Sequence, residues 1–267
     1  MNRTPVVFIH GAWLHAQSWE AWAERFAGQG FLALTPGWPG EAATARDTRL
    51  SPGPLAGLDL DALTDHYAGI VRSLGVPPVL IGHSVGGLIA QRLVADEAGR
   101  AAVAIAPAPI NRVPLPRAPV TARMPGGGAA DPLMALLPEQ FHEVFANTVT
   151  AEESGRLFER YAVPVPRRLL TDLGCDGAAR SPLARVDTGN AVRGPLLLIS
   201  GQEDLLVPDA VTRAVYKEYG DSTAVTDLKQ FADRAHSLVV DAGWRFVADY
   251  VLGWLDEHGV RPLTETG

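Results

Sequence analysis

Cysteine and positive charge are both scarce in this chain of 267 residues. Cys175 is the only cysteine, so an internal disulfide and a cysteine-based metal cluster are excluded. Lysine and arginine together number 23, against 30 aspartates and glutamates, which gives a net charge of −7. Nucleic acids and anionic membranes both require clustered positive charge. We therefore expect neither of them as a partner.

Long apolar runs are lacking as well. The longest cannot span a bilayer, and the run Val6–Ile9 is too short for the core of a signal peptide. Hydrophobic residues still make up 47% of the chain, which is typical of a folded globular protein with one core. We expect a soluble, cytoplasmic protein. The sequence leaves its oligomeric state open, and a homodimer is one of the arrangements it allows.

Short runs of branched apolar residues alternate with longer stretches of helical periodicity. The short runs predict six strands: Pro5–Ile9, Phe31–Thr35, Pro78–Ile81, Ala102–Ala106, Pro195–Ser200 and Thr223–Leu228. The longer stretches predict helices at Ser18–Gln29, Asp59–Leu74, Leu88–Asp96, Asp209–Tyr219 and Trp244–His258. This alternation predicts an α/β protein with a doubly wound, mostly parallel sheet of about six strands.

One long segment interrupts the alternation. Residues 107–190 contain no strand-like run, and their first part is dense in proline, which excludes a helix interior or a central strand there. Two short helices are predicted within it, at Pro138–Asn147 and Thr150–Tyr161. We expect residues 1–106 and 191–267 to form the core and residues 107–190 to form a helical cap over it. Gly126–Gly128 would then be a mobile gate for the substrate.

The motif Gly82-His83-Ser84-Val85-Gly86 stands between a predicted strand and a predicted helix. A serine on so tight a turn has a strained backbone, and side chains at the flanking glycines would collide with neighbouring backbone. The turn lifts the Ser84 hydroxyl above the carboxyl edge of the sheet. A serine in a glycine-rich turn by chance is the plain alternative, and the strand-to-helix context disfavours it.

At this motif the chain resembles the α/β-hydrolase superfamily, and the resemblance extends over its whole length. His10-Gly11-Ala12-Trp13, after the first strand, is similar to the oxyanion loop of that superfamily, especially in its methylesterase and hydroxynitrile-lyase branch. The resemblance implies that the amides of Ala12 and Val85 form the oxyanion hole. We expect His10 to be structural, and Trp13 and His83 to contact the substrate.

The general base and its orienting acid follow from the order of residues in this fold, which is serine, then acid, then histidine. His236 is the histidine that fits, because it follows the last predicted strand, whereas His142 lies in the predicted cap and His258 in the last helix. Asp204 lies in a stretch that resembles the acid loop of the family. We favour it over the neighbouring Glu203 on spacing.

These residues predict a carboxylesterase-like serine hydrolase that cleaves a small or medium carboxylic ester, lactone or thioester through an acyl-enzyme on Ser84. The expected partner is a small-molecule substrate, and no metal, flavin or nucleotide cofactor is needed. Phe145 and Tyr161 of the predicted cap are expected to line the substrate pocket. Alternatives are a cofactor-free perhydrolase, C–C hydrolase or lyase using the same triad, or a ligand-binding member without catalysis.

Two features depart from the resemblance. Many relatives carry Asp-x-Pro-Gly-His-Gly after the second strand, where this chain has Thr35-Pro36-Gly37-Trp38-Pro39-Gly40-Glu41. Trp38 and Glu41 make this loop unusual, and we expect the loop to help shape the mouth of the pocket. The lyase branch also needs a lysine near the base, and Lys229 is the only lysine nearby, which disfavours lyase activity.

Overall fold

The computed structural model describes residues 3–111, 113–115, 131–175 and 182–262. Six strands form one sheet in which every neighbouring pair is parallel, in the order β2-β1-β3-β4-β7-β8. They are β1 (Pro5–Ile9), β2 (Leu32–Leu34), β3 (Val79–His83), β4 (Ala101–Ile105), β7 (Leu196–Gly201) and β8 (Thr226–Phe231). The predicted α/β class and six-stranded parallel sheet are confirmed.

The central strands are buried on both faces, as branched and small apolar residues along their whole length require. Every residue of β1, β3, β4 and β7 is buried, whereas the edge strand β8 is half-buried throughout. The chain runs from β1 outward to β2 and then returns to the other side of β1 with β3. The direction of winding therefore changes between β1 and β3, and ligands of open α/β sheets bind at the carboxyl ends of such strands.

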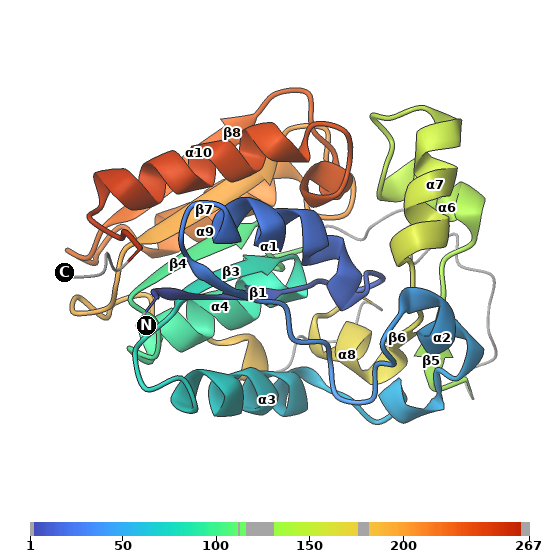
Figure 1. Ribbon diagram of the computed structural model, residues 1–267, viewed down its shortest axis with the longest axis horizontal. Helices are drawn as coiled ribbons and strands as arrows, with labels where there is room; N and C mark the ends of the chain where they lie inside the picture. The colour runs from blue at the N-terminus through green and yellow to red at the C-terminus, as the bar shows by residue number, and fades with distance from the viewer. Residues whose placement is uncertain (1–2, 112, 116–130, 176–181, 263–267) are drawn as a thin grey trace.

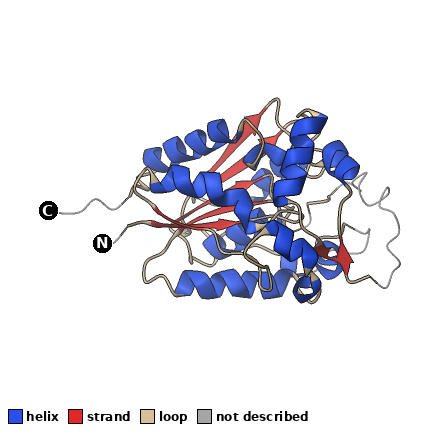
Figure 2. Ribbon diagram, turned by 45° about the vertical axis from the view of Figure 1, so that its right-hand side comes forward, coloured by secondary structure: helices blue, strands red, loops and turns tan. Residues whose placement is uncertain are grey.

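Helices cover both faces of the sheet (Figure 1; Figure 2). On one face, α1 (Glu20–Ala27) packs against α10 (Trp244–Glu257), where the rings of Trp22 and Trp244 lie 6.2 Å apart. The other face carries α3 (Leu60–Arg72), α4 (Val85–Ala95) and α9 (Asp209–Glu218). The hydroxyl of Tyr219, at the end of α9, donates to Oε1 of Gln91 in α4 at 2.9 Å. The sheet is thus enclosed by two helical layers.

The middle of the chain adds a group of short elements at one end of the sheet (Figure 1). These are β5 (Leu133–Met134), α6 (Pro138–Val144), α7 (Ala151–Tyr161), β6 (Val165–Pro166) and α8 (Arg167–Asp172). The expectation that residues 107–190 contain no strand is wrong, because β5 and β6 pair antiparallel. Each has only two residues, too few to leave a periodic signal. The division into core and cap stays a prediction, and Gly126–Gly128 lie outside the described residues.

Short helices on other connections also went unpredicted. They are α2 (Ala45–Leu50), η1 (Ala16–Trp19), η2 (Gly53–Leu55), η3 (Pro182–Ala184) and η4 (His236–Val239). The first of them is capped by Thr44, whose hydroxyl oxygen accepts from the amide of Asp47 at 3.1 Å. None of the helices in the described parts of the chain combines the length and the apolarity needed to cross a bilayer.

Candidate active site

Ser84 stands between β3 and α4 with a backbone conformation that residues other than glycine rarely adopt. Its φ is 55° and its ψ is −120°. The two glycines of the motif make this turn sterically feasible: a Cβ on Gly82 would lie 2.0 Å from the carbonyl oxygen of Gly86, and one on Gly86 would lie 2.1 Å from that of Ile9. The Ser84 amide donates to the carbonyl of Ile105 in β4 at 2.9 Å. The sequence therefore places the Ser84 hydroxyl on a strained turn that leaves no room for side chains at the flanking glycines.

His236 and Asp204 meet at the carboxyl ends of the last two strands. Nδ1 of His236 lies 2.7 Å from Oδ2 of Asp204, and both residues are buried. Because the carboxylate accepts only, Nδ1 carries the proton, and Nε2 is the ring nitrogen left to accept one. His236 and Ser84 line the same pocket. The structure thus brings together the three residues that the sequence singled out.

The loop after β7 holds the acid in place. Oδ1 of Asp204 accepts hydrogen bonds from the amides of Leu206 and Val207, both at 2.8 Å. This leaves Oδ2 free to face His236. Glu203, the alternative acid, is exposed to solvent and does not contact the histidine in the described structure. The spacing argument for Asp204 therefore agrees with the geometry.

His83 and Phe145 surround His236 and are not among the described residues that line the pocket, so their role as substrate contacts stays a prediction. Nε2 of His83 donates to the backbone carbonyl of His236 at 3.0 Å. Burial lowers the pKa of His83 well below its ordinary value, and the neighbouring His236 ring lowers it further, so the His83 ring is neutral. The ring of Phe145 meets that of His236 edge-on at 5.0 Å, and its carbonyl accepts from the Ser237 amide at 2.9 Å. Both residues hold the histidine loop.

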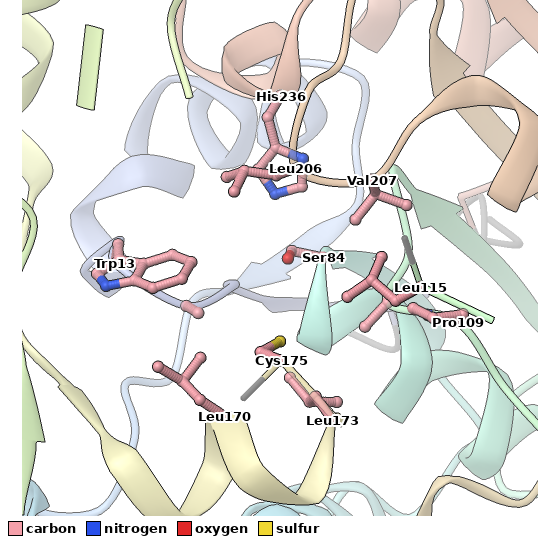
Figure 3. Close-up of a pocket in the computed structure, with 12 residues that line it drawn as sticks. Trp13, Ser84, Pro109, Leu115, Leu170, Leu173, Cys175, Leu206, Val207 and His236 are labelled. Atoms are coloured by element: carbon pink, nitrogen blue, oxygen red, sulfur yellow. The ribbon is translucent and has the colours of Figure 1, made fainter. Parts of the chain in front are cut away.

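The pocket around Ser84 encloses about 500 Å³ between its lining atoms, some of it open to solvent. Figure 3 shows the Ser84 hydroxyl at its centre, with His236 on one side and Leu170 and Leu173 on the opposite side. Apart from Ser84 and His236, the described lining is apolar or weakly polar: Ala12, Trp13, Ala108, Pro109, Leu115, Leu170, Leu173, Cys175, Leu206 and Val207. No charged side chain is among them.

Two aromatic residues predicted to contact the substrate lie in different places. Trp13 lines the pocket, and its contact with the substrate stays a prediction. Tyr161 is not among the described lining residues: it is buried, and its carbonyl accepts from the His15 amide at 2.9 Å. Its position at the end of α7 directs it toward the loop after β1. The pocket residues of α8 and of the loop after Asp204 were missed, because isolated leucines and valines look the same in a pocket as in a core.

The amides expected to form the oxyanion hole lie on either side of Ser84. Ala12 follows β1 and lines the pocket, and Val85 begins α4. Neither amide donates to another residue that the structure describes. A Cβ on Gly11 would lie 2.6 Å from Cβ of Ser84, so only glycine lets the loop approach the serine this closely. The placement fits two donors converging on one oxygen.

No residue of the loop 35–41 is among the described residues that line the Ser84 pocket. Trp38 and the side chain of Glu41 are buried beside His10, whose ring stacks on the indole of Trp38 with the ring centres 4.7 Å apart. The His10 ring faces Glu41, and His10 is not among the described residues that line the pocket. Among the described residues there is no group of three histidine, cysteine or carboxylate side chains placed to hold a metal ion.

The comparisons with known proteins agree with this architecture. A monoacylglycerol lipase from Paleococcus ferrophilus has a TM-score of 0.69 and 21% identity, with 95% of this chain and 94% of that chain covered. A methylesterase from Arabidopsis has a TM-score of 0.66 and 18% identity, with 95% and 99% covered. A pyrethroid hydrolase has a TM-score of 0.61 and 18% identity, with 95% and 97% covered.

At these identities the structural similarities establish the fold alone. No curated protein sequence is similar enough to this chain to count as a match. The sequence profile of the Alpha/beta hydrolase family, however, matches residues 6–250, which include the strained serine and its two partners. This chain is therefore a member of the Alpha/beta hydrolase family.

Proposed function

We propose that the protein is a serine hydrolase that cleaves carboxylic esters with an apolar, uncharged acyl group. The observation that carries the proposal is the buried His236–Asp204 contact of 2.7 Å beside a strained serine in one apolar pocket. The relatives described above are a lipase, a methylesterase and a pyrethroid hydrolase, which supports ester cleavage as the reaction.

In the first half-reaction, Oγ of Ser84 attacks the ester carbonyl carbon while Nε2 of His236 takes the hydroxyl proton. The carbonyl oxygen becomes an oxyanion facing the amides of Ala12 and Val85. The bond to the leaving alkoxide then breaks, and His236 returns the proton to it. This step releases the alcohol and leaves the acyl group on Ser84.

In the second half-reaction, His236 takes a proton from water, and the resulting hydroxide attacks the acyl-enzyme. Its collapse releases the carboxylic acid and restores the Ser84 hydroxyl. Asp204 keeps the proton on Nδ1 of His236 throughout and stabilises the imidazolium that forms twice in the cycle. The chain's own residues supply every group that this cycle requires.

The lining of the pocket supports the substrate class. An apolar group gains about 25 cal/mol for each Å² that it buries, whereas a charged group loses its hydration without gaining a partner here. A lyase would need a cation near His236. The ammonium of Lys229 instead lies 4.8 Å from the centre of the Tyr250 ring, and Lys229 is not among the described pocket residues. Nothing here favours lyase activity.

The test is a panel of p-nitrophenyl esters from acetate to octanoate, with the hemisuccinate as the charged member and matched lactones and thioesters beside it. We expect kcat/KM to be highest for an uncharged acyl chain and lowest for the hemisuccinate. Ser84→Ala should be inactive, while Ser73→Ala, which changes an exposed serine, should retain full activity. Absence of turnover across the panel, together with no fluorophosphonate label on Ser84, would contradict the proposal.

A further inference from the structure

A buried carboxylate lies beside the oxyanion loop but outside the Ser84 pocket. The side chain of Glu41 is only 2% exposed and faces His10, the residue directly before Gly11. A buried charge is costly unless it is paired. No step of the proposed acyl transfer uses Glu41, so its burial at this place calls for another role.

Each ring nitrogen of His10 faces an oxygen. Nδ1 lies 3.1 Å from the carbonyl oxygen of Gly11, and Nε2 lies 3.2 Å from Oε1 of Glu41. A carbonyl and an ionised carboxylate only accept hydrogen bonds, so the two contacts are satisfied together when both ring nitrogens donate. In that form His10 and Glu41 make a buried ion pair. The indole of Trp38, stacked on the His10 ring at 24°, holds the plane of this cation.

The other histidine beside Glu41, His15, does not carry a charge that could pair with the carboxylate. Nδ1 of His15 accepts from the amide of Gln17, and its Nε2 donates to the carbonyl of Ala42, both at 3.1 Å, so this ring is neutral. Burial lowers the pKa of His15, which agrees with that assignment. Burial raises the pKa of the Glu41 carboxyl, but the charge of His10 and the other contacts lower it by more, so the net shift is downward.

The contact from His10 to Gly11 bears directly on the oxyanion hole. The carbonyl of Gly11 and the amide N–H of Ala12 belong to one peptide unit, which is planar. Fixing the direction of that carbonyl therefore fixes the direction of the N–H. The same carbonyl also accepts from the amide of Leu14 at 3.4 Å, so two donors hold it. The Ala12 amide is left pointing away from both of them.

We propose that Glu41 and His10 are positioning residues for the oxyanion hole. The Glu41 carboxylate holds the His10 imidazolium, and His10 holds the Gly11–Ala12 peptide so that its N–H faces the reacting carbonyl oxygen. The proposal rests on the acyl transfer proposed above. Donors that are fixed before the reaction stabilise the oxyanion without reorganising during the step, and one such donor is worth about 10²–10³ in kcat.

The first test compares an ester with its thiono analogue, in which sulfur replaces the carbonyl oxygen. Sulfur accepts hydrogen bonds poorly, so the rate advantage of the oxygen ester reports on the oxyanion hole. In Glu41→Ala we expect kcat for the ester to fall by about 10²-fold, the loss of roughly one donor. The KM should change little, and the thionoester rate should hardly change. The ratio of the ester rate to the thionoester rate should therefore fall by about the same factor as kcat for the ester.

The structure also offers chemical rescue. Glu41 lines a polar cavity of about 620 Å³, some of it open to solvent, that shares no described lining residue with the Ser84 pocket and that Glu20 also lines. This space can admit formate in place of the removed carboxylate. Added formate should restore part of the ester kcat in Glu41→Ala, whereas formamide, which is neutral, should not. Glu20→Ala is the matched control, because the Glu20 side chain is 45% exposed and pairs with Arg160 instead of His10.

Glu41→Gln keeps the shape of the side chain and serves if the alanine variant unfolds. A neutral amide does not stabilise the imidazolium, so kcat and the ester-to-thionoester ratio should again fall, and pairing it with His10→Gln should add little further loss. Unchanged ratios in folded Glu41 variants, or equal losses in Glu20→Ala, would overturn the positioning role. If the unmutated protein neither turns over esters nor takes a fluorophosphonate label on Ser84, it is the proposed function that fails.

Discussion

The two sides of the oxyanion loop differ in their chemistry. On the side of Ser84, the described pocket residues are apolar or weakly polar except for Ser84 and His236. On the other side, His10, Glu41 and His15 form a buried layer of ionisable groups. Backbone of Gly11 and Ala12 separates the two regions.

This contrast separates two tasks. An apolar pocket selects its occupant by size and by the absence of charge, and it provides few groups that could align a carbonyl. Alignment depends instead on peptide units that are themselves held by buried polar contacts behind the loop. Mutations on the pocket side should therefore change substrate preference, and mutations on the other side should change kcat for every substrate.

The largest effect is expected at the one polar group in the pocket that becomes covalently bound. Ser84→Ala should lower kcat by about 10⁶-fold, as loss of the nucleophile does in a comparable triad. The melting temperature should change little, since the hydroxyl contributes almost no packing. Stopped-flow release of p-nitrophenol and a thermal melt measure both. A variant that kept a substantial share of the activity would show that another group attacks the ester.

The next effect concerns the support of His236. Asp204→Asn should lower kcat by about 10⁴-fold, because an amide at this position favours the wrong tautomer of the imidazole. Glu203→Gln is the control: it is the neighbouring acid, but it is exposed and should leave kcat unchanged. If the two substitutions had equal effects on the ester rate, the orienting role of Asp204 would be refuted.

On the pocket side, Leu170→Asn should reduce the preference for apolar acyl chains. Replacing a buried leucine by a polar side chain removes about 1.5–3 kcal/mol of apolar transfer energy, which is roughly a 10- to 100-fold change in relative kcat/KM. The measurement is the ratio of kcat/KM for the octanoate ester to that for the hemisuccinate. Leu50→Asn, at a site that is 75% exposed, is the control and should not change it.

A substitution at Phe145 tests whether a residue that packs on His236 also contributes to substrate preference. Because its ring packs on His236 and it is not among the described pocket residues, Phe145→Leu should lower kcat modestly and equally for short and long acyl chains. The loss should be smaller than in Asp204→Asn. A changed ratio between octanoate and acetate esters would instead restore the original expectation that Phe145 contacts the substrate.

The smallest effect is on stability, on the charged side of the loop. The pKa of Glu41 in the folded protein lies below its ordinary value of 4.5, so the folded state favours the ionised form. This contribution is complete above the ordinary value and is lost as pH falls through the folded pKa. The difference in unfolding free energy between the unmutated protein and Glu41→Gln should therefore shrink on acidification. Urea titrations from about pH 7 to about pH 3 measure it.

The strands and the meeting of Ser84, Asp204 and His236 could be predicted from the sequence because each has a local signal. The branched apolar runs agree with the observed strands to within three residues; β8, a half-buried edge strand, lies three residues later than expected. Ser84, Asp204 and His236 each follow a strand, and parallel strands bring their carboxyl ends to one edge. The serine motif, the resemblance of the acid loop and the chain order therefore sufficed to predict that they lie together.

The pocket and its surroundings could not be predicted in the same way. Leu170 lies on α8, a helix of six residues with no distinct sequence pattern. Phe145 was assigned to the substrate because it is aromatic, but composition does not reveal which neighbour an aromatic ring will meet. Glu41 was recognised as unusual, yet its direction depends on the tertiary approach of its loop to His10. These outcomes depend on contacts between segments distant in the chain.

The most direct test of the central claim is to trap the acyl-enzyme. The unmutated protein would be mixed with p-nitrophenyl octanoate, quenched in acid during turnover and analysed by intact and peptide mass spectrometry. We predict a mass increase of one octanoyl group on the peptide that contains Ser84, and none in Ser84→Ala. Turnover with no adduct, or with the acyl group on the neighbouring pocket residue Cys175, would contradict it.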